Sequence, residues 1–135
     1  MYMNILVPVS FDTERDAQEA IDVAKALAGK GARITLLHVI EHIPSYAISY
    51  MSQDYLDEAA QAVQAELEKM AEGIENAKAV VIEGHSGRSI LDWAKENWAD
   101  CIVIASHRPG MQDYLLGSTA AHVVRHAGCA VHVVR

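Results

Sequence analysis

Five short apolar runs rich in β-branched residues recur along the chain. Such runs predict β-strands, because branched side chains pack well on a pleated surface and short continuous apolar segments are typical of strands covered on both faces. The predicted strands are residues 4–9 (NILVPV), 34–40 (ITLLHVI), 79–82 (AVVI), 101–105 (CIVIA) and 130–134 (AVHVV).

The longer segments between these runs have apolar residues at helical spacing, which predicts amphipathic helices. In the first segment these residues are Ala17, Ala20, Ile21, Ala24, Leu27 and Ala28, and in the second they are Tyr55, Leu56, Ala59, Val63, Leu67 and Met70. Residues 89–98 and 118–126 predict a third and a fourth helix, each opening with a serine that can cap unpaired amides.

Strands and helices therefore alternate along the whole chain. This order predicts an α/β, Rossmann-like fold: a doubly wound, five-stranded parallel sheet of strand order 3-2-1-4-5 with helices on both faces. The carboxyl ends of strands one and four should then flank a ligand crevice, with residues 40–42 as a side wall. Residues 41–53 are weakly patterned, so we expect them to form a lid or wall rather than a tight turn.

Composition limits the classes of protein and partner. A chain of 135 residues that is 51% hydrophobic predicts one domain over residues 1–135. The 11 basic and 18 acidic residues give a net charge of −7, which opposes binding to nucleic acid or to an anionic membrane. An anionic ligand must therefore be held by local contacts.

Cysteine usage and the N-terminus indicate a cytoplasmic protein. Cys101 and Cys129 lie in apolar runs without a CxxC pair, which predicts buried thiols in a reducing compartment rather than a disulfide. The first apolar run is too short for a signal peptide, and no later run has the length of a membrane span.

The most informative stretch joins the fourth predicted strand to the last helix. Gly117, Ser118 and Thr119 stand at a helix start, where unpaired amides and the positive end of the helix dipole can bind phosphate. Ser106, His107 and Arg108 follow the strand and would face the same helix start. The alternative is that the hydroxyls only cap the helix and that Arg108 is a solvated loop charge.

This stretch, IVIASHRPGMQDYLLGSTAAHVVRHAGCAVHVV, resembles the universal stress protein family, as do the opening residues NILVPVSFDTERDAQEAIDVAKALA, the ITLLHVI strand and EGHSGRSILDWAKE. The resemblance covers essentially the whole chain. It implies a stress-response or regulatory module, a homodimer through the C-terminal strand, and ATP bound in the crevice. The alternative is an interaction protein of the same fold that binds no nucleotide.

The resemblance also implies which residues would bind ATP. The main chain at Val39 would meet the adenine, and Pro8, Val9 and Ser10 would line the ribose side. Ala105, Ser106, His107 and Arg108, together with Gly117, Ser118 and Thr119, would hold the phosphates. The chain departs from the family pattern where Ala105 and Arg108 replace glycines and Ser10 replaces an aspartate.

Other kinds of chemistry find less support. VPVSFDTERD lacks the glycines and lysine of a P-loop, so we expect no enzyme activity beyond slow ATP hydrolysis or autophosphorylation. His122 and His126 share a helix face but lack a third ligand, so the metal we expect is Mg²⁺ carried by ATP phosphates. Trp93 and Trp98 are expected to be packing aromatics, since nothing basic accompanies them for nucleic acid binding.

Overall fold

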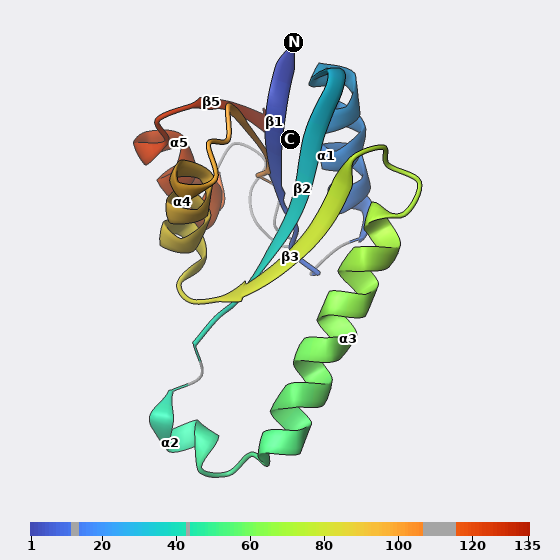
Figure 1. Ribbon diagram of the computed structural model, residues 1–135. Helices are drawn as coiled ribbons and strands as arrows, with labels where there is room; N and C mark the ends of the chain where they lie inside the picture. The colour runs from blue at the N-terminus through green and yellow to red at the C-terminus, as the bar shows by residue number, and fades with distance from the viewer. Residues whose placement is uncertain (12–13, 43, 107–115) are drawn as a thin grey trace.

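A five-stranded parallel sheet forms the centre of the molecule (Figure 1). The computed structural model describes residues 1–11, 14–42, 44–106 and 116–135. The strands are β1 (Tyr2–Pro8), β2 (Ala28–Ile40), β3 (Ala77–Glu83), β4 (Cys101–Ala105) and β5 (Ala130–Val134). Their order across the sheet is β3-β2-β1-β4-β5 and every pairing is parallel, which confirms the predicted fold class and strand order.

Helices cover both faces of this sheet. They are α1 (Glu14–Leu27), the short α2 (Ser45–Ile48), α3 (Gln53–Ala71), α4 (Ser86–Glu96) and α5 (Ser118–His126). Helices α1 and α3 pack on one face, and α4 and α5 pack on the other. Successive strand residues serve opposite faces, so Ile5 and Val7 join the first layer of core while Leu6 joins the second.

The predicted bounds of four elements are wrong. Strand β1 spans Tyr2–Pro8 instead of residues 4–9, and β3 spans Ala77–Glu83 instead of residues 79–82. Strand β2 begins at Ala28, a residue we expected in the first helix, because the strand extends to pair with Tyr2 near the start of β1. Helix α4 begins at Ser86 rather than at Ser89 and ends at Glu96. Trp98 therefore lies beyond the helix, 86% exposed and at a positive φ of 59°, so it is not a packing aromatic. Trp93 packs against the core as expected.

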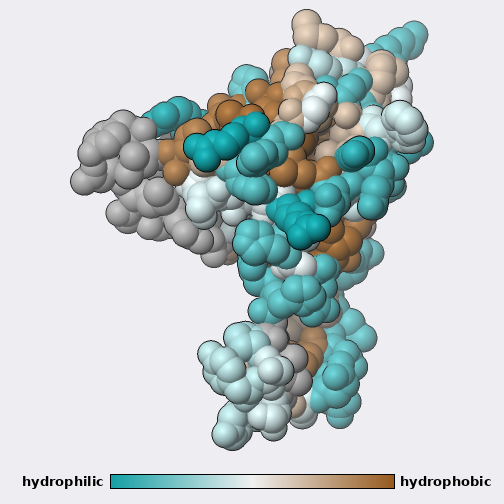
Figure 2. Space-filling view, turned by 90° about the vertical axis from the view of Figure 1, so that its left-hand side faces the viewer, coloured by the Kyte–Doolittle hydropathy of each residue, from teal (hydrophilic) through white to brown (hydrophobic). Residues whose placement is uncertain are grey.

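Helix α3 and the segment before it form an arm that extends past the sheet. Leu67 is the only buried residue that α3 contributes, and it lies toward the C-terminal end of the helix. The N-terminal half of α3 and α2 reach away from the sheet (Figure 1) and form a separate, mostly hydrophilic lobe in Figure 2. Tyr46, Tyr50 and Tyr55 are all more than half exposed on this arm.

Two further expectations concern the cysteines and membrane-spanning helices. Cys101 is buried and Cys129 is partly buried, and neither forms a disulfide. Burial raises the pKa of Cys101 to about 11, so its thiol stays protonated at neutral pH. Among the helices that the structure describes, none has the length and apolar character needed to span a membrane.

Candidate functional site

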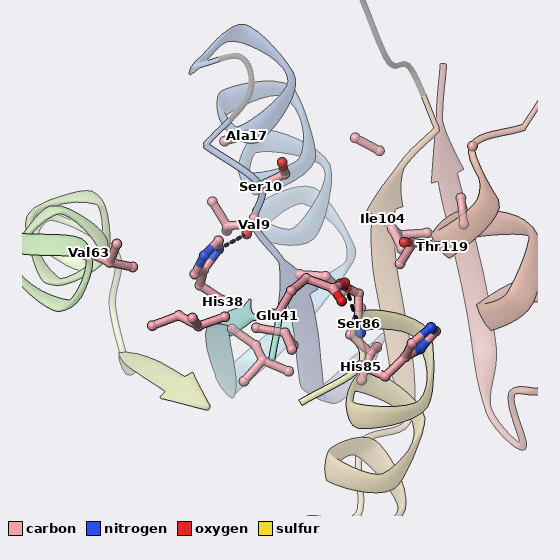
Figure 3. A pocket seen from close by; sticks show the side chains of 18 of the residues that line it. Val9, Ser10, Ala17, His38, Glu41, Val63, His85, Ser86, Ile104 and Thr119 are labelled. Carbon is pink, nitrogen blue, oxygen red and sulfur yellow. Dashed lines mark hydrogen bonds between the residues drawn. The ribbon is translucent and has the colours of Figure 1, made fainter. Parts of the chain in front are cut away.

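A cavity of about 810 Å³ lies at the carboxyl ends of the central strands. It is lined by the ends of β1, β2 and β4, by the first residues of α4 and α5, and by one side of α3 (Figure 3). Its volume falls in the range of sites that bind small molecules or cofactors, about 300–1,000 Å³. The doubly wound topology creates this opening because β1 and β4 lead their chains to opposite faces of the sheet.

The cavity brings together most of the residues predicted for the site. The predicted residues on its lining are Pro8, Val9, Ser10, Val39, Ala105, Ser106, Gly117, Ser118 and Thr119. They come from three strands and one helix that are far apart in the sequence. His107 and Arg108 lie outside the described residues.

Val39 presents its main chain to the cavity because the neighbouring strand stops short of it. The pairing of β1 with β2 ends at Pro8 and Leu37, followed by one bond of 2.8 Å from the Val9 amide to the Leu37 carbonyl. The Val9 carbonyl is instead 2.7 Å from Nδ1 of His38. Main-chain groups of a strand alternate in direction, so those of Val39 point toward the side that β1 has vacated. They can bind the edge of a planar ligand there.

The first amides of α5 belong to residues that line the same cavity, and they have no hydrogen-bond partner among the described residues. Gly117 is the N-cap residue and has no side chain to bond the first turn. The first amide of this turn that pairs within the helix is that of Ala121, which donates to the Gly117 carbonyl at 2.9 Å. The amides of Ser118, Thr119 and Ala120 precede it, and all three residues line the cavity. Ser118 is the first helical residue, so our expectation that it caps the helix is wrong.

Ser106 connects the end of β4 to this helix start. Its carbonyl accepts from the Gly117 amide at 3.3 Å, and its buried hydroxyl donates to the Val134 carbonyl at 3.2 Å. A buried hydroxyl needs such a partner, since leaving it unpaired would be destabilising. Ser106 therefore positions the α5 start against the strand ends.

The start of α4 also faces the cavity, but its first amide is already paired. Glu41, directly after β2, accepts from both the amide and the hydroxyl of Ser86 through Oε1 (Figure 3). The hydrogen bond from the Ser86 side chain is the main cause that lowers the pKa of Glu41. A carboxylate therefore caps α4 from another element, in place of the serine cap that the sequence predicted.

Charge on the lining is unevenly distributed. Glu41 is acidic, and among the lining residues that the structure describes there is no lysine or arginine. The rings of His122 and His126 lie 4.6 Å apart on α5. No group of three metal-ligating side chains occurs within the described ranges. Within the part of the chain that the structure describes, an anionic ligand in this cavity would therefore be held by helix amides and hydroxyl groups.

Comparison with known proteins identifies the family. The model of the universal stress protein family matches residues 1–135. Universal stress protein A homolog 2 of Coxiella burnetii is 33% identical over 141 residues, which cover 99% of this chain and 95% of that protein. The chain belongs to the universal stress protein family. Universal stress protein G of Escherichia coli O157:H7 is 30% identical over the full length of both chains.

Solved structures agree with this assignment. Universal stress protein UspA from Lactobacillus plantarum is 30% identical, with a TM-score of 0.74 over 99% of this chain and 98% of its own. A universal stress protein from Archaeoglobus fulgidus, solved in complex with dAMP, has a TM-score of 0.70 at 19% identity over 99% and 98% of the chains. A further universal stress protein structure, solved in complex with cAMP, has a TM-score of 0.64 at 23% identity over 99% of this chain and 97% of its own. The last two show that the fold is shared.

Several lining residues of this universal stress protein were not among the predicted ligand contacts. Helix α3 contributes Tyr55, Leu56 and Val63, whose helical spacing we interpreted only as the apolar side of an amphipathic helix. His85 and Ser86 also line the cavity, because α4 begins earlier than predicted. No local signal distinguishes an apolar helix face that lines a cavity from one that packs in a core.

The Glu41 cap should give measurable, pH-dependent stability. Glu41→Ala should lower the free energy of unfolding by about 1 kcal/mol at neutral pH, the usual loss for an N-cap contact. Because the folded-state pKa of Glu41 lies below its ordinary value of 4.5, this stabilisation is present above that pH. It is lost as the pH falls through the folded-state pKa. Urea unfolding at pH 7 and at pH 3 should show the gap between wild type and variant closing in acid.

Proposed function

We propose that this universal stress protein binds an adenine nucleotide in the cavity at the carboxyl ends of its strands. The observation that carries the proposal is that two main-chain sites share one lining: the edge of Val39, and the first amides of α5, which have no partner among the described residues. The first can bind the edge of a purine by donating and accepting hydrogen bonds. The second suits phosphate, because helix amides and the helix dipole both favour an anion.

The two helix starts on the lining differ in a way that would orient a bound nucleotide. At α4, the carboxylate of Glu41 occupies the first amide and repels phosphate. At α5, the N-cap glycine leaves the amides accessible. The phosphates would therefore lie toward Ser118 and Thr119, and the base toward β2.

The known ligands of related folds support this class of molecule. Universal stress proteins with this fold have been solved with dAMP and with cAMP, both adenine nucleotides. For this chain we propose ATP as the nucleotide, with Mg²⁺ held mainly by phosphate oxygens and water, since magnesium needs few protein ligands. Arg108 would add a charge-assisted contact to phosphate.

We further propose a cytoplasmic regulatory role rather than turnover. At the α5 start, the described side chains on the lining are the hydroxyls of Ser118 and Thr119 and the methyl of Ala120, none of which is a general base at neutral pH. Bound nucleotide would instead change the conformation of the cavity walls and so alter which partner the protein binds.

The decisive experiment is to look for nucleotide that copurifies with the protein. Protein purified without dialysis would be denatured in acid, and the supernatant analysed by absorbance and chromatography. Adenine nucleotide at close to one molar equivalent supports the proposal. If none is released and calorimetry with AMP and ATP shows no heat of binding, the chain is instead an interaction protein of the same fold that binds no nucleotide.

We also propose a homodimer through β5, which is the last strand of the sheet. The Val134 carbonyl accepts from the Ser106 amide at 2.9 Å, so the main chain of Val134 faces β4. By alternation, the main-chain groups of Val131 and Val133 face outward from the edge. Pairing this edge with a second copy would cover it and form a two-fold contact.

Val131→Pro should abolish this dimer without disrupting the fold. Proline removes the outward amide, and a single edge position tolerates it because the bonds to β4 use the alternate residues. Light scattering at micromolar concentration should show a folded monomer. His132→Pro, which removes an inward amide, is the matched control and should destabilise the β4–β5 pairing. A folded Val131→Pro dimer would place the interface elsewhere.

A further inference from the structure

We propose that Glu41 is a specificity-determining residue of the cavity, whose carboxylate accepts a hydrogen bond from the nucleoside part of the ligand rather than facing its phosphates. The donor would be a ribose hydroxyl or the amino group of the adenine. This inference rests on the proposed function, and it names the chemistry on the side of the cavity that the end of β2 and the start of α4 form.

The position of Glu41 places it beside the base. It follows β2 directly and stands two residues after Val39, so the alternation of the strand directs its side chain to the same face of the sheet as the side chain of Val39. In Figure 3 the Glu41 side chain lies between the end of β2 and the start of α4, inside the residues that line the cavity.

Ser86 holds the Glu41 side chain in place through one of its two carboxylate oxygens. Oε1 accepts from the Ser86 amide at 3.3 Å and from the Ser86 hydroxyl. No described residue donates a hydrogen bond to Oε2. The side chain is thus oriented before any ligand arrives, which reduces the entropy lost on binding.

Charge decides which part of a nucleotide such a group can contact. The hydrogen bonds from Ser86 lower the pKa of Glu41, so the group is an ionised, acceptor-only carboxylate at neutral pH. A phosphate close to it would be repelled, whereas hydroxyl and amino groups are donors. In other doubly wound folds an acidic residue near the end of the second strand accepts a hydrogen bond from a ribose hydroxyl, so the contact proposed for Glu41 has a chemical precedent.

The test is calorimetry on Glu41→Gln with adenosine, AMP, ATP, dAMP and IMP. Glutamine keeps an oxygen for Ser86 but removes the charge, so circular dichroism should show an unchanged fold. Adenosine and ATP should both bind about tenfold more weakly, by the same factor. A smaller preference for AMP over dAMP would identify the ribose 2′-hydroxyl as donor, and a smaller preference for AMP over IMP would identify the amino group.

Glu83→Gln is the matched control. It removes one exposed carboxylate from the end of β3, where Glu83 pairs with His42 at 3.2 Å outside the cavity lining, and it should leave all affinities unchanged. Ser86→Ala should give a smaller loss than Glu41→Gln, because the carboxylate remains but is held less firmly.

Opposite outcomes separate this inference from the proposed function. If wild type binds adenosine and ATP but Glu41→Gln binds them equally well, or binds ATP more tightly, Glu41 does not contact the nucleoside and the inference is overturned. If wild type binds none of the five ligands, the proposed function fails and the inference fails with it.

Discussion

Gly117→Asp should abolish nucleotide binding and at the same time raise the stability of the ligand-free protein. Gly117 is the N-cap of α5 with φ of −60° and ψ of 155°, an extended conformation that aspartate adopts without strain. An added Cβ would lie 3.4 Å from the Ser106 carbonyl oxygen, at ordinary contact distance. The new carboxylate would accept from the first-turn amides and occupy the proposed phosphate site.

The two expected effects have opposite signs. Loss of the amides and repulsion between carboxylate and phosphate should weaken ATP binding by at least about a hundredfold. The cap and its interaction with the helix dipole should raise the free energy of unfolding by about 0.5–1 kcal/mol. Calorimetry measures the first quantity, and urea unfolding of nucleotide-free protein measures the second.

Two further substitutions at Gly117 separate charge from space. Asparagine also caps but adds no charge, so Gly117→Asn should weaken ATP less than Gly117→Asp. Alanine adds only a Cβ, and Gly117→Ala should leave ATP affinity within about threefold of wild type, since the methyl group meets no short contact with any residue that the structure describes. If Gly117→Asp still binds ATP as wild type does, the phosphates lie away from α5.

Leu67→Ala should cause the largest loss of stability among the changes considered. Leu67 is fully buried and is the only buried residue of α3, packed with Ile34 and Leu36 of β2 in the same layer of core. Truncating a buried leucine leaves a cavity and typically lowers the free energy of unfolding by about 3 kcal/mol. The melting temperature should fall by roughly 10 °C for a domain of this size.

The loss of stability in Leu67→Ala should also loosen the wall of the ligand cavity that α3 forms. Limited proteolysis should cleave the arm of Leu67→Ala faster than that of wild type. Glu66→Ala, the neighbouring change on the exposed side of α3, is the control and should alter the free energy of unfolding by less than about 0.5 kcal/mol. A loss below about 1 kcal/mol for Leu67→Ala would mean that α3 is anchored by other contacts.

Patterns local to the chain were sufficient to predict much of this fold. β4, β5 and α5 have the predicted bounds, because the spacing of apolar side chains that marks a strand or a helix can be recognised from neighbouring residues alone. The order of strands also followed, since alternating strands and helices with right-handed crossovers leave few arrangements of a parallel sheet.

Contacts distant in sequence decided the early starts of β2 and α4. The early start of β2 depends on pairing between Ala28 and Tyr2, which lie on different strands. The early start of α4 depends on Glu41, which lies 45 residues before Ser86. Neither partner can be recognised from the residues around the element itself.

The sequence by itself determined the parallel sheet, its strand order, and the set of strand ends and the helix start that meet at the cavity, because these follow from local periodicity and chain topology. Only the tertiary structure decided how the two helix starts differ. Glu41 folds onto Ser86 and pairs the first amide of α4, whereas Gly117 leaves the amides of α5 accessible. That difference arises from a hydrogen bond between distant residues, which forms only when β2 and α4 are packed together.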